Sequence, residues 1–576
     1  MLTFNELKKN LKKDFTDFKK VKVAVLGDTA TQFLVKALRG TGYEHMYNLE
    51  VWEADFNQIE NQIFDEDSDL FKFNPDVVII FYSSHKLLAK YNKLKPEDYS
   101  QLAVTQMELI KILHASLCSR LQSKKIIFYN YTEINDSVFG NYANKTEASF
   151  LFQQRKLNYE LMSYSSINPD FHIVDLSSLQ NQFGKSIFFQ PSVYINTDMV
   201  LSIDIVPEIA AKTVDLILAM TGKFKKCLIL DLDNTMWGGI IGDDGIENIQ
   251  IGALGIGKAF TEFQYWIKKL QNRGVILAVC SKNTESVAKE PFEKHPDMIL
   301  RLEDFAVFVA NWENKPDNIR KVQSILNIGF DSMVFIDDNP FERNIVRENI
   351  PGIMVPELPE DPAEYLEYLY TLNLFETVTF SDQDAARTKQ YQVDAERMSI
   401  QQSFTNENDF LKSLKMVSLV SHFNKFNTPR VAELSNRSNQ FNLRTLRYSE
   451  IDIERFAGSE DFFTFAFTLE DKFGDNGLIC VIILKKENTE TLFIDTWFMS
   501  CRVLKRGMEN FVTNTIANYA IDKGFRFLKG EYIPTEKNGM VKEHYSNLGF
   551  KDVDGFWMLD TLEYENRDCF ITKKDQ

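Results

Sequence analysis

Residues 225–235 read KKCLILDLDNT, an apolar run that ends in two aspartates separated by one residue. A continuous apolar run of this kind is typical of a strand in a parallel sheet that is buried on both faces. Successive side chains of a strand point to opposite faces, so Asp231 and Asp233 leave the backbone on the same side. Two carboxylates in this position can divide the roles of nucleophile and proton donor.

The same pattern repeats on the C-terminal side of this stretch. Apolar runs at 275–283 (VILAVCSKN), 298–305 (MILRLEDF) and 332–340 (SMVFIDDNP) alternate with helix-like segments. Each run ends in polar residues, and the carboxyl ends of strands in an open α/β sheet form the ligand crevice. We therefore predict strands at these runs and a Rossmann-like domain over residues 221–375.

The polar residues at the predicted strand ends suit phosphoryl transfer. Asp337 and Asp338 follow an apolar strand, and carboxylates that face a phosphate favour Mg²⁺. Ser281 and Lys315 could offset the charge on the oxygens of a transferring phosphate. Each residue alone has an ordinary explanation: a turn for the aspartates, a helix cap for Ser281 and a solvated surface for Lys315. Their shared position at strand ends and helix starts favours catalysis.

The order of these motifs resembles that of the haloacid dehalogenase (HAD) superfamily, and residues 230–245, LDLDNTMWGGIIGDDG, closely resemble the opening of its FkbH-like proteins. The resemblance implies an aspartyl-phosphate enzyme with Mg²⁺ as cofactor. It implies that Asp231 is the nucleophile, Asp233 the general acid/base and Thr235 a phosphate ligand. Ser281 and Lys315 would stabilise the phosphate.

The resemblance also implies the metal ligands, which are Asp231, the backbone of Asp233, and the pair Asp337 and Asp338. Of that pair we prefer Asp338 as the direct ligand. Neither interval between the motifs has room for a large cap domain, so we expect a site that is open to bulky substrates.

Residues 1–220 are predicted to form a separate parallel-sheet domain of flavodoxin or SGNH type. Apolar runs at 21–27, 76–84, 124–130 and 171–179 alternate with helix-like segments. Residues 27–29, GDT, are similar to the nucleophile block of SGNH hydrolases, with Thr29 in place of serine. No D-x-x-H motif stands near the end of the domain, so this hydroxyl lacks a base. We expect Thr29 to cap a helix and the domain to bind or position rather than hydrolyse.

Residues 376–408 are expected to be a helical linker, and residues 409–576 an α+β domain. Strings such as SNRSNQFNLRTLRYS (435–449) and MSCRVLKRGME (499–509) resemble the C-terminal part of FkbH-like proteins, which is similar to GNAT acyltransferases. In the turn that binds pyrophosphate in GNAT enzymes, Arg502 and Gly507 match, but Lys505 replaces a glycine and would obstruct the approach of a pyrophosphate. A carrier-protein arm has a single phosphodiester, so it requires less close contact with the backbone of this turn than a pyrophosphate does.

Several further residues are candidates for binding. Cys501 could hold an acyl group, because a thiol beside Arg502 and a helix N-terminus ionises readily; the alternative is a small buried hydrophobe. Arg502 and Asn439 are predicted to bind substrate, although Asn439 could equally cap a loop. In the HAD domain, Asn234 and Asn283 are predicted to bind substrate.

Composition restricts the partners and the compartment. The six cysteines form no C-x-x-C pair, so reduced thiols are expected. No apolar window approaches the ~20 residues of a membrane span, and the N-terminal stretch lacks the apolar core of a signal peptide. The net charge of -17 disfavours nucleic-acid and anionic-membrane binding. We expect a soluble cytoplasmic protein.

The resemblance implies a function in polyketide biosynthesis. FkbH-like proteins take a glyceryl unit from 1,3-bisphosphoglycerate, release phosphate and load an acyl carrier protein. A phosphorylated small molecule and a carrier protein are therefore the expected partners. A plain phosphatase for soluble phosphoesters is one alternative, and a GNAT-type acyltransferase or carrier-docking protein is another.

Overall fold

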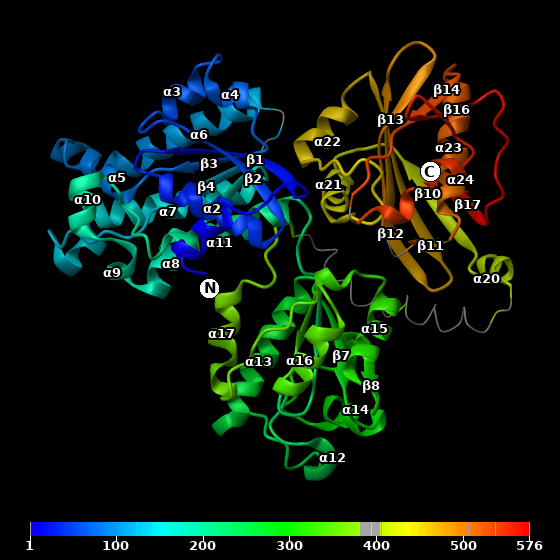
Figure 1. Cartoon of the computed structure of the whole chain (residues 1–576), viewed down its shortest axis with the longest axis horizontal. Helices are drawn as coiled ribbons and strands as arrows, with labels where there is room; N and C mark the ends of the chain where they lie inside the picture. Colours follow the sequence, from blue (N-terminus) through cyan, green and yellow to red (C-terminus); the bar gives the residue numbers. More distant parts are fainter. Residues whose placement is uncertain are drawn as a thin grey trace. The chain divides into compact units, whose positions relative to one another are not determined.

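The computed structural model describes residues 2–121, 123, 125–380, 393, 404, 406–500, 503–504, 506–535 and 537–574. It divides into two compact units, Met1–Leu218 and Ala219–Gln576. The described residues form three sheets, two of them parallel and one mixed (Figure 1). The predicted multidomain α/β class is thereby confirmed.

The first unit contains a five-stranded parallel sheet with the order β2-β1-β3-β4-β5. Every residue of β3 and β4 is buried, which explains why these strands read as unbroken apolar runs. The strands are β1 (Lys19–Gly27), β2 (Tyr47–Glu53), β3 (Val77–Phe81), β4 (Ile126–Tyr129) and β5 (Phe171–Val174). The sequence prediction missed β2, because this edge strand is only partly buried and its residues alternate in polarity.

Helices connect these strands. They are α1 (Phe4–Asn10), α2 (Gln32–Glu44), α3 (Ile59–Phe64), α4 (Asp69–Phe73), α5 (Ser84–Tyr91), α6 (Leu102–Arg120), α7 (Phe150–Ile167), α8 (Leu176–Phe183), α9 (Lys185–Phe188), α10 (Pro191–Thr197) and α11 (Val206–Met220).

Thr29 does not cap a helix, contrary to the sequence-based expectation. Its hydroxyl donates a hydrogen bond to the backbone carbonyl of Asp198, and α2 instead begins after Thr31. The neighbouring Asp28 is buried, and the amide of Ser83 donates to both of its carboxylate oxygens at 2.9 and 3.0 Å. Burial raises the pKa of Asp28 to about 7, although the hydrogen bonds from Ser83 act in the opposite direction.

The second unit begins with a four-stranded parallel sheet of order β8-β7-β6-β9. Its strands are β6 (Cys227–Leu230), β7 (Ile276–Ser281), β8 (Phe305–Ala310) and β9 (Met333–Ile336). Its helices are α12 (Ile241–Asp244), α13 (Gly255–Asn272), α14 (Glu285–Lys294), α15 (Lys315–Leu326), α16 (Pro340–Asn349) and α17 (Tyr365–Leu372). Every residue of the two central strands β6 and β7, and of the edge strand β9, is buried.

One predicted strand of this sheet was placed too early in the chain. The strand expected at 298–305 lies at 305–310, where the sequence FAVFVA is continuously apolar. Residues 302–304 form a 3-10 turn instead, and the buried carboxylate of Asp304 pairs with Lys268 at 2.5 Å. A carboxylate with a fixed partner ends the apolar stretch on its N-terminal side, so the strand begins after it.

The remainder of the second unit is built on an eight-stranded mixed sheet of order β15-β16-β14-β13-β12-β11-β10-β17. Its strands are β10 (Met416–Ser421), β11 (Phe462–Asp471), β12 (Gly474–Lys486), β13 (Thr491–Met499), β14 (Phe527–Gly530), β15 (Lys551–Val553), β16 (Phe556–Asp560) and β17 (Ile571–Lys574). Its helices are α20 (Glu407–Ser413), α21 (Thr428–Arg437), α22 (Glu450–Ala457), α23 (Met508–Asp522) and α24 (His544–Asn547). The expected helical linker lies largely outside the described residues.

Among the residues that the structure describes, no helix is both long enough and apolar enough to cross a bilayer.

We predict that Asp28→Asn stabilises the protein in a pH-dependent way. Because the folded-state pKa of Asp28 lies above the unfolded-state value, its contribution to stability is complete below about pH 4 and is lost as the pH rises through 7. The neutral amide avoids this loss, so the variant should gain roughly 1 to 3 kcal/mol at pH 8 and nothing at pH 4. Calorimetric unfolding at both pH values measures the difference.

The exposed Asp55→Asn variant is the control, since its side chain is solvated in both states. A gain for Asp28→Asn that is equal at pH 4 and pH 8 would contradict the assigned cause.

Candidate active site

Three adjacent strands bring the predicted catalytic residues to one edge of the sheet. Asp231 directly follows β6, Ser281 ends β7, and Asp337 directly follows β9. Because β6 pairs with both β7 and β9 in parallel, these three strand ends are neighbours. Residues 106 positions apart in the sequence thus meet in one site.

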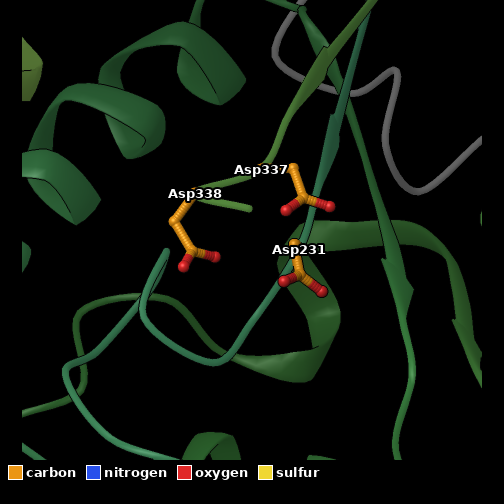
Figure 2. A group of neighbouring side chains, drawn as sticks. All are labelled: Asp231, Asp337 and Asp338. Carbon is orange, nitrogen blue, oxygen red and sulfur yellow. The ribbon is translucent and has the colours of Figure 1, made fainter. Parts of the chain in front are cut away.

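The carboxylates of Asp231, Asp337 and Asp338 form the centre of this site (Figure 2). One oxygen of each residue lies within 4.8 Å of one oxygen of both others. Asp231 and Asp337 are buried, and Asp338 is partly exposed. A set of carboxylate oxygens without a histidine or cysteine fits a hard cation such as Mg²⁺.

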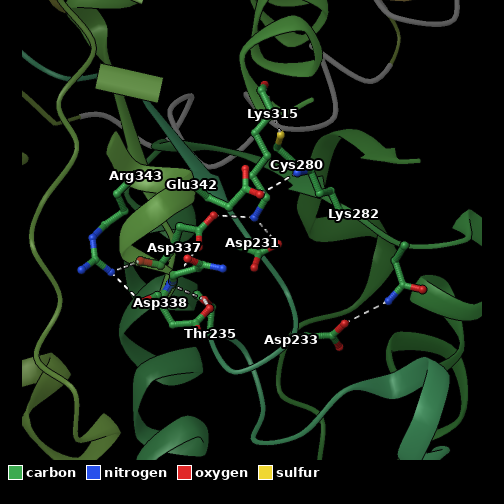
Figure 3. A network of polar contacts seen from close by, with 12 residues as sticks. Asp231, Asp233, Thr235, Cys280, Lys282, Lys315, Asp337, Asp338, Glu342 and Arg343 are labelled. Atoms are coloured by element: carbon green, nitrogen blue, oxygen red, sulfur yellow. Dashed lines mark hydrogen bonds and ion pairs between the residues drawn. The ribbon is translucent and has the colours of Figure 1, made fainter. Parts of the chain in front are cut away.

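Lys315 supplies the positive charge nearest to this cluster. It is the first residue of α15, its side chain is 3% exposed, and its Nζ lies 2.9 Å from Asp231 Oδ1. The same ammonium group pairs with Asp337 Oδ2 (Figure 3). One cation therefore links the end of β6 to the end of β9.

Burial and charge shift the ionisation of these groups. Burial acts to lower the pKa of Lys315, but Asp231 and Asp337 outweigh it and raise that pKa above the ordinary value. Burial, followed by repulsion from Asp231, raises the pKa of Asp338. Burial is also the main cause that raises the pKa of Asp233. Three carboxylates meet one ammonium group in this cluster, and a divalent cation would offset the excess of carboxylates.

Asp337 and Asp338 differ in their remaining contacts. The Oδ1 of Asp337 accepts a hydrogen bond from the amide of Asn339 at 2.8 Å, so both oxygens of Asp337 have protein partners. Asp338 Oδ1 accepts from the hydroxyl of Thr235 at 3.2 Å, and the amide of Asp338 donates to the same hydroxyl at 3.1 Å. Thr235, predicted to bind phosphate, is thus engaged in holding Asp338.

Asp233 points to different partners from those of the carboxylate cluster. Its Oδ1 accepts from the indole N–H of Trp237 and from the amide of Ile241, each at 3.0 Å. Its Oδ2 accepts from the side-chain amide of Asn283 at 3.1 Å. Asn283, predicted to bind substrate, therefore contacts the predicted acid.

The side chain of Asn234 makes a local hydrogen bond within the turn after the aspartates. Its side-chain oxygen accepts from the amide of Gly239 at 2.9 Å, which closes the turn after the aspartates. Its backbone has a positive φ of 56°, a conformation that asparagine tolerates better than most residues. Asn234 is exposed and directly follows Asp233 in the chain, but its side-chain oxygen is already engaged in the turn.

Sequence reasoning missed the residues that support the cluster from α16. The guanidinium of Arg343 donates to the backbone carbonyls of Asp337 and Asp338 at 2.8 and 2.6 Å. The buried Glu342 pairs with Lys282 at 2.6 Å, which ties α16 to the segment after β7. The only sequence signal was their position directly after the second pair of aspartates.

The predicted site residues of the C-terminal sheet lie elsewhere. The Asn439 side chain donates to the carbonyl of Gly222 at 2.7 Å and accepts from Arg447. Cys501, Arg502 and Lys505 lie outside the described residues.

No domain-sized insertion separates the motifs. Between β6 and β7 the chain forms only α12 and α13, and between β7 and β8 only α14 and a 3-10 turn, all within described residues. Among these described residues no cap domain is therefore inserted between the motifs, as expected from the sequence.

Comparisons with known proteins place this arrangement in a family. Residues 22–218 match the model of the FkbH N-terminal domain. The N-terminal part of a Bacteroides fragilis protein, which contains a phosphatase domain and was crystallised with Mg, is 57% identical and has a TM-score of 0.64. The match covers 66% of this chain and 100% of that chain.

Lower similarities concern about a quarter of the chain. The Escherichia coli ribosomal-protein-S18-alanine N-acetyltransferase is 13% identical, with a TM-score of 0.20, and the match covers 25% of this chain and 89% of that chain. The GNAT domain of the S. lividans protein PAT is 16% identical, with a TM-score of 0.20, and that match covers 24% of this chain and 86% of that domain. No curated protein is significantly similar in sequence. On the strength of the 57% identity over the full length of the Bacteroides structure, the chain belongs to the FkbH-like family.

Proposed function

We propose that the protein is a Mg²⁺-dependent phosphatase of the HAD type that works through an aspartyl-phosphate on Asp231. The observation that carries this proposal is the meeting of three carboxylates with the buried Lys315 at the ends of β6 and β9. The related Bacteroides phosphatase domain, which was crystallised with Mg, supports the same reading.

Asp231 and Asp338 are the side chains that we propose as direct ligands of Mg²⁺. Both oxygens of Asp337 have protein partners, whereas among the described residues only Oδ1 of Asp338 accepts a hydrogen bond from a side chain. The sequence-based preference for Asp338 is consistent with this difference. When bound, the cation supplies charge that offsets the phosphate and the surrounding carboxylates.

The reaction then follows from the protein's own groups. An oxygen of Asp231 attacks phosphorus, the bond from phosphorus to the leaving oxygen breaks, and Asp233 donates a proton to that oxygen. In the second half, Asp233 accepts a proton from water, the water oxygen attacks phosphorus, and inorganic phosphate leaves Asp231. Lys315 and Ser281 offset charge on the phosphate oxygens in both halves.

For the substrate we propose a phosphorylated acyl donor such as 1,3-bisphosphoglycerate, whose glyceryl group is loaded onto an acyl carrier protein. Membership in the family and the uncapped entrance support this choice. In this proposal the thiol that receives the acyl group belongs to the carrier. Its sulfur attacks the carbonyl carbon of the acyl phosphate, the carbon–oxygen bond to phosphate breaks, and inorganic phosphate leaves with the thiol proton. The phosphate ester at the other end of the donor is the group that Asp231 removes. Cys280 beside the site is buried, and burial raises its pKa to about 12, so it is poorly suited to hold the acyl group.

We predict that Asp231→Asn abolishes Mg²⁺-dependent phosphate release. The amide cannot act as the nucleophile, so the rate should fall by at least ~1,000-fold, as measured with a phosphate-release assay. The exposed Asp297→Asn variant of the same domain serves as the control and should retain full activity. Full activity of Asp231→Asn would contradict the assignment of the nucleophile.

We predict that Asp338→Asn weakens Mg²⁺ binding by at least ~10-fold, because a neutral amide replaces a ligand carboxylate. Asp337→Asn should weaken it less, because Asp337 acts mainly through Lys315. Titration calorimetry with Mg²⁺ alone measures both. If Asp337→Asn causes the larger loss, the order of the two ligands must be reversed.

Glyceryl transfer has its own test. Wild-type protein, 1,3-bisphosphoglycerate and a carrier protein bearing the pantetheine thiol should yield a glyceryl adduct on the carrier, detected by mass spectrometry. The same carrier without its pantetheine arm is the control and should remain unmodified. Phosphate release without any adduct would instead identify a plain phosphatase.

A further inference from the structure

The side chain of Asp233 is held by three hydrogen-bond donors that come from two separate segments. Trp237 N–H and Ile241 N–H reach Oδ1 at 3.0 Å each, and Asn283 N–H reaches Oδ2 at 3.1 Å. The position of Asp233 in the site can be followed in Figure 3. Asp233 is also absent from the group formed by Asp231, Asp337 and Asp338.

The donor from Asn283 cannot easily reverse its direction. Asn283 is 5% exposed, and its side-chain oxygen accepts from the amide of Thr284 at 2.9 Å. Turning the amide around would break this bond as well as the bond to Asp233. The NH₂ group therefore stays directed at Asp233 Oδ2.

The donor from Trp237 is equally well anchored. The indole is completely buried and packs edge-on against Phe292, with ring centroids 5.6 Å apart. The backbone carbonyl of Met236 accepts from the buried side chain of Gln264 at 2.9 Å, which fixes the residue before Trp237. The following Gly239 has a φ of 97°, a conformation that lets the chain turn back so that Ile241 N–H reaches the same carboxylate.

These contacts decide which lone pair of Asp233 can carry a proton. A carboxylate offers about four lone-pair positions, two on each oxygen. The two donors at Oδ1 and the one at Oδ2 occupy three of them. Among the described residues, no donor occupies the remaining position on Oδ2, so a proton on the acid would sit there.

We propose that Trp237 and Asn283 are positioning residues for Asp233, which they hold so that the proton given to the leaving oxygen sits on Oδ2. This inference rests on the proposed function, in which Asp233 is the general acid. As the phosphorus–oxygen bond breaks, its electron pair stays on the leaving oxygen, and that oxygen takes the proton from Oδ2. Asp231 forms the new bond to phosphorus in the same step.

The test compares two substrates that differ in their need for this proton. A p-nitrophenyl phosphate leaving group departs without protonation, whereas an alkyl phosphate leaving group needs it. In the full-length protein, Asn283→Leu and Trp237→Phe should each lower kcat/KM for an alkyl phosphate by ~10- to 100-fold and for p-nitrophenyl phosphate by less than ~3-fold. KM should change little, because in this inference both residues act through their contacts to Asp233 and not through the substrate.

The controls separate this inference from the proposed function. Asp233→Asn should show the same selective loss, and Asn344→Leu, at an exposed asparagine of α16, should show none. If Asp233→Asn is selective but both positioning variants lose equally with the two substrates, or lose nothing, the positioning role is wrong and the proposed function stands. If Asp233→Asn itself shows no selectivity, the proposed acid fails, and the inference fails with it.

Protein stability is checked by thermal unfolding before the kinetic comparison. Asn283→Ser, which keeps a small polar side chain, replaces Asn283→Leu if the leucine prevents folding, and Trp237→Phe tests the same role independently.

Discussion

The buried ion pair of Lys315 with Asp231 and Asp337 is the interaction on which the site depends. The carboxylate oxygens of Asp231 and Asp337 lie within 4.8 Å of each other, so the two groups would repel each other if no positive charge lay between them. Lys315 enters from α15 and contacts both, so it permits the two strand ends to carry acids side by side. Removing one member of a buried ionic group costs far more than the group contributes in net stability, because the partners remain buried and unpaired.

Helix placement reinforces this arrangement. Both α15 and α16 begin directly at the acidic edge, with Asn314 and Asn339 as their capping residues. The N-terminus of a helix carries partial positive charge, which favours nearby carboxylates. Arg343 holds the backbone of the same turn. Its guanidinium donates to the carbonyls of Asp337 and Asp338 and pairs with Glu357 at 2.9 Å. The turn that carries both aspartates is therefore fixed from its backbone as well as from its side chains.

Two large aromatic side chains are exposed beyond the ends of the two outer strands of the four-stranded sheet. Trp312 follows β8 and is 74% exposed, and Phe341 follows β9 and is 65% exposed. Because β8 and β9 lie at opposite edges of the four-stranded sheet, these aromatic side chains stand on opposite sides of the central strand β6.

The alternation of strands and helices, the order of the motifs and the identity of the charged residues could be predicted from the sequence, because apolar periodicity and strand-end polarity are local properties. The prediction misplaced β8 by several residues and missed β2, since the partner that fixes Asp304 and the partial burial of an edge strand are not local. The contacts by which Thr235 holds Asp338 and Asn283 holds Asp233 could be seen only in the folded chain. Each of these contacts joins segments at least 50 residues apart, and which donor reaches which carboxylate depends on how neighbouring strands pack.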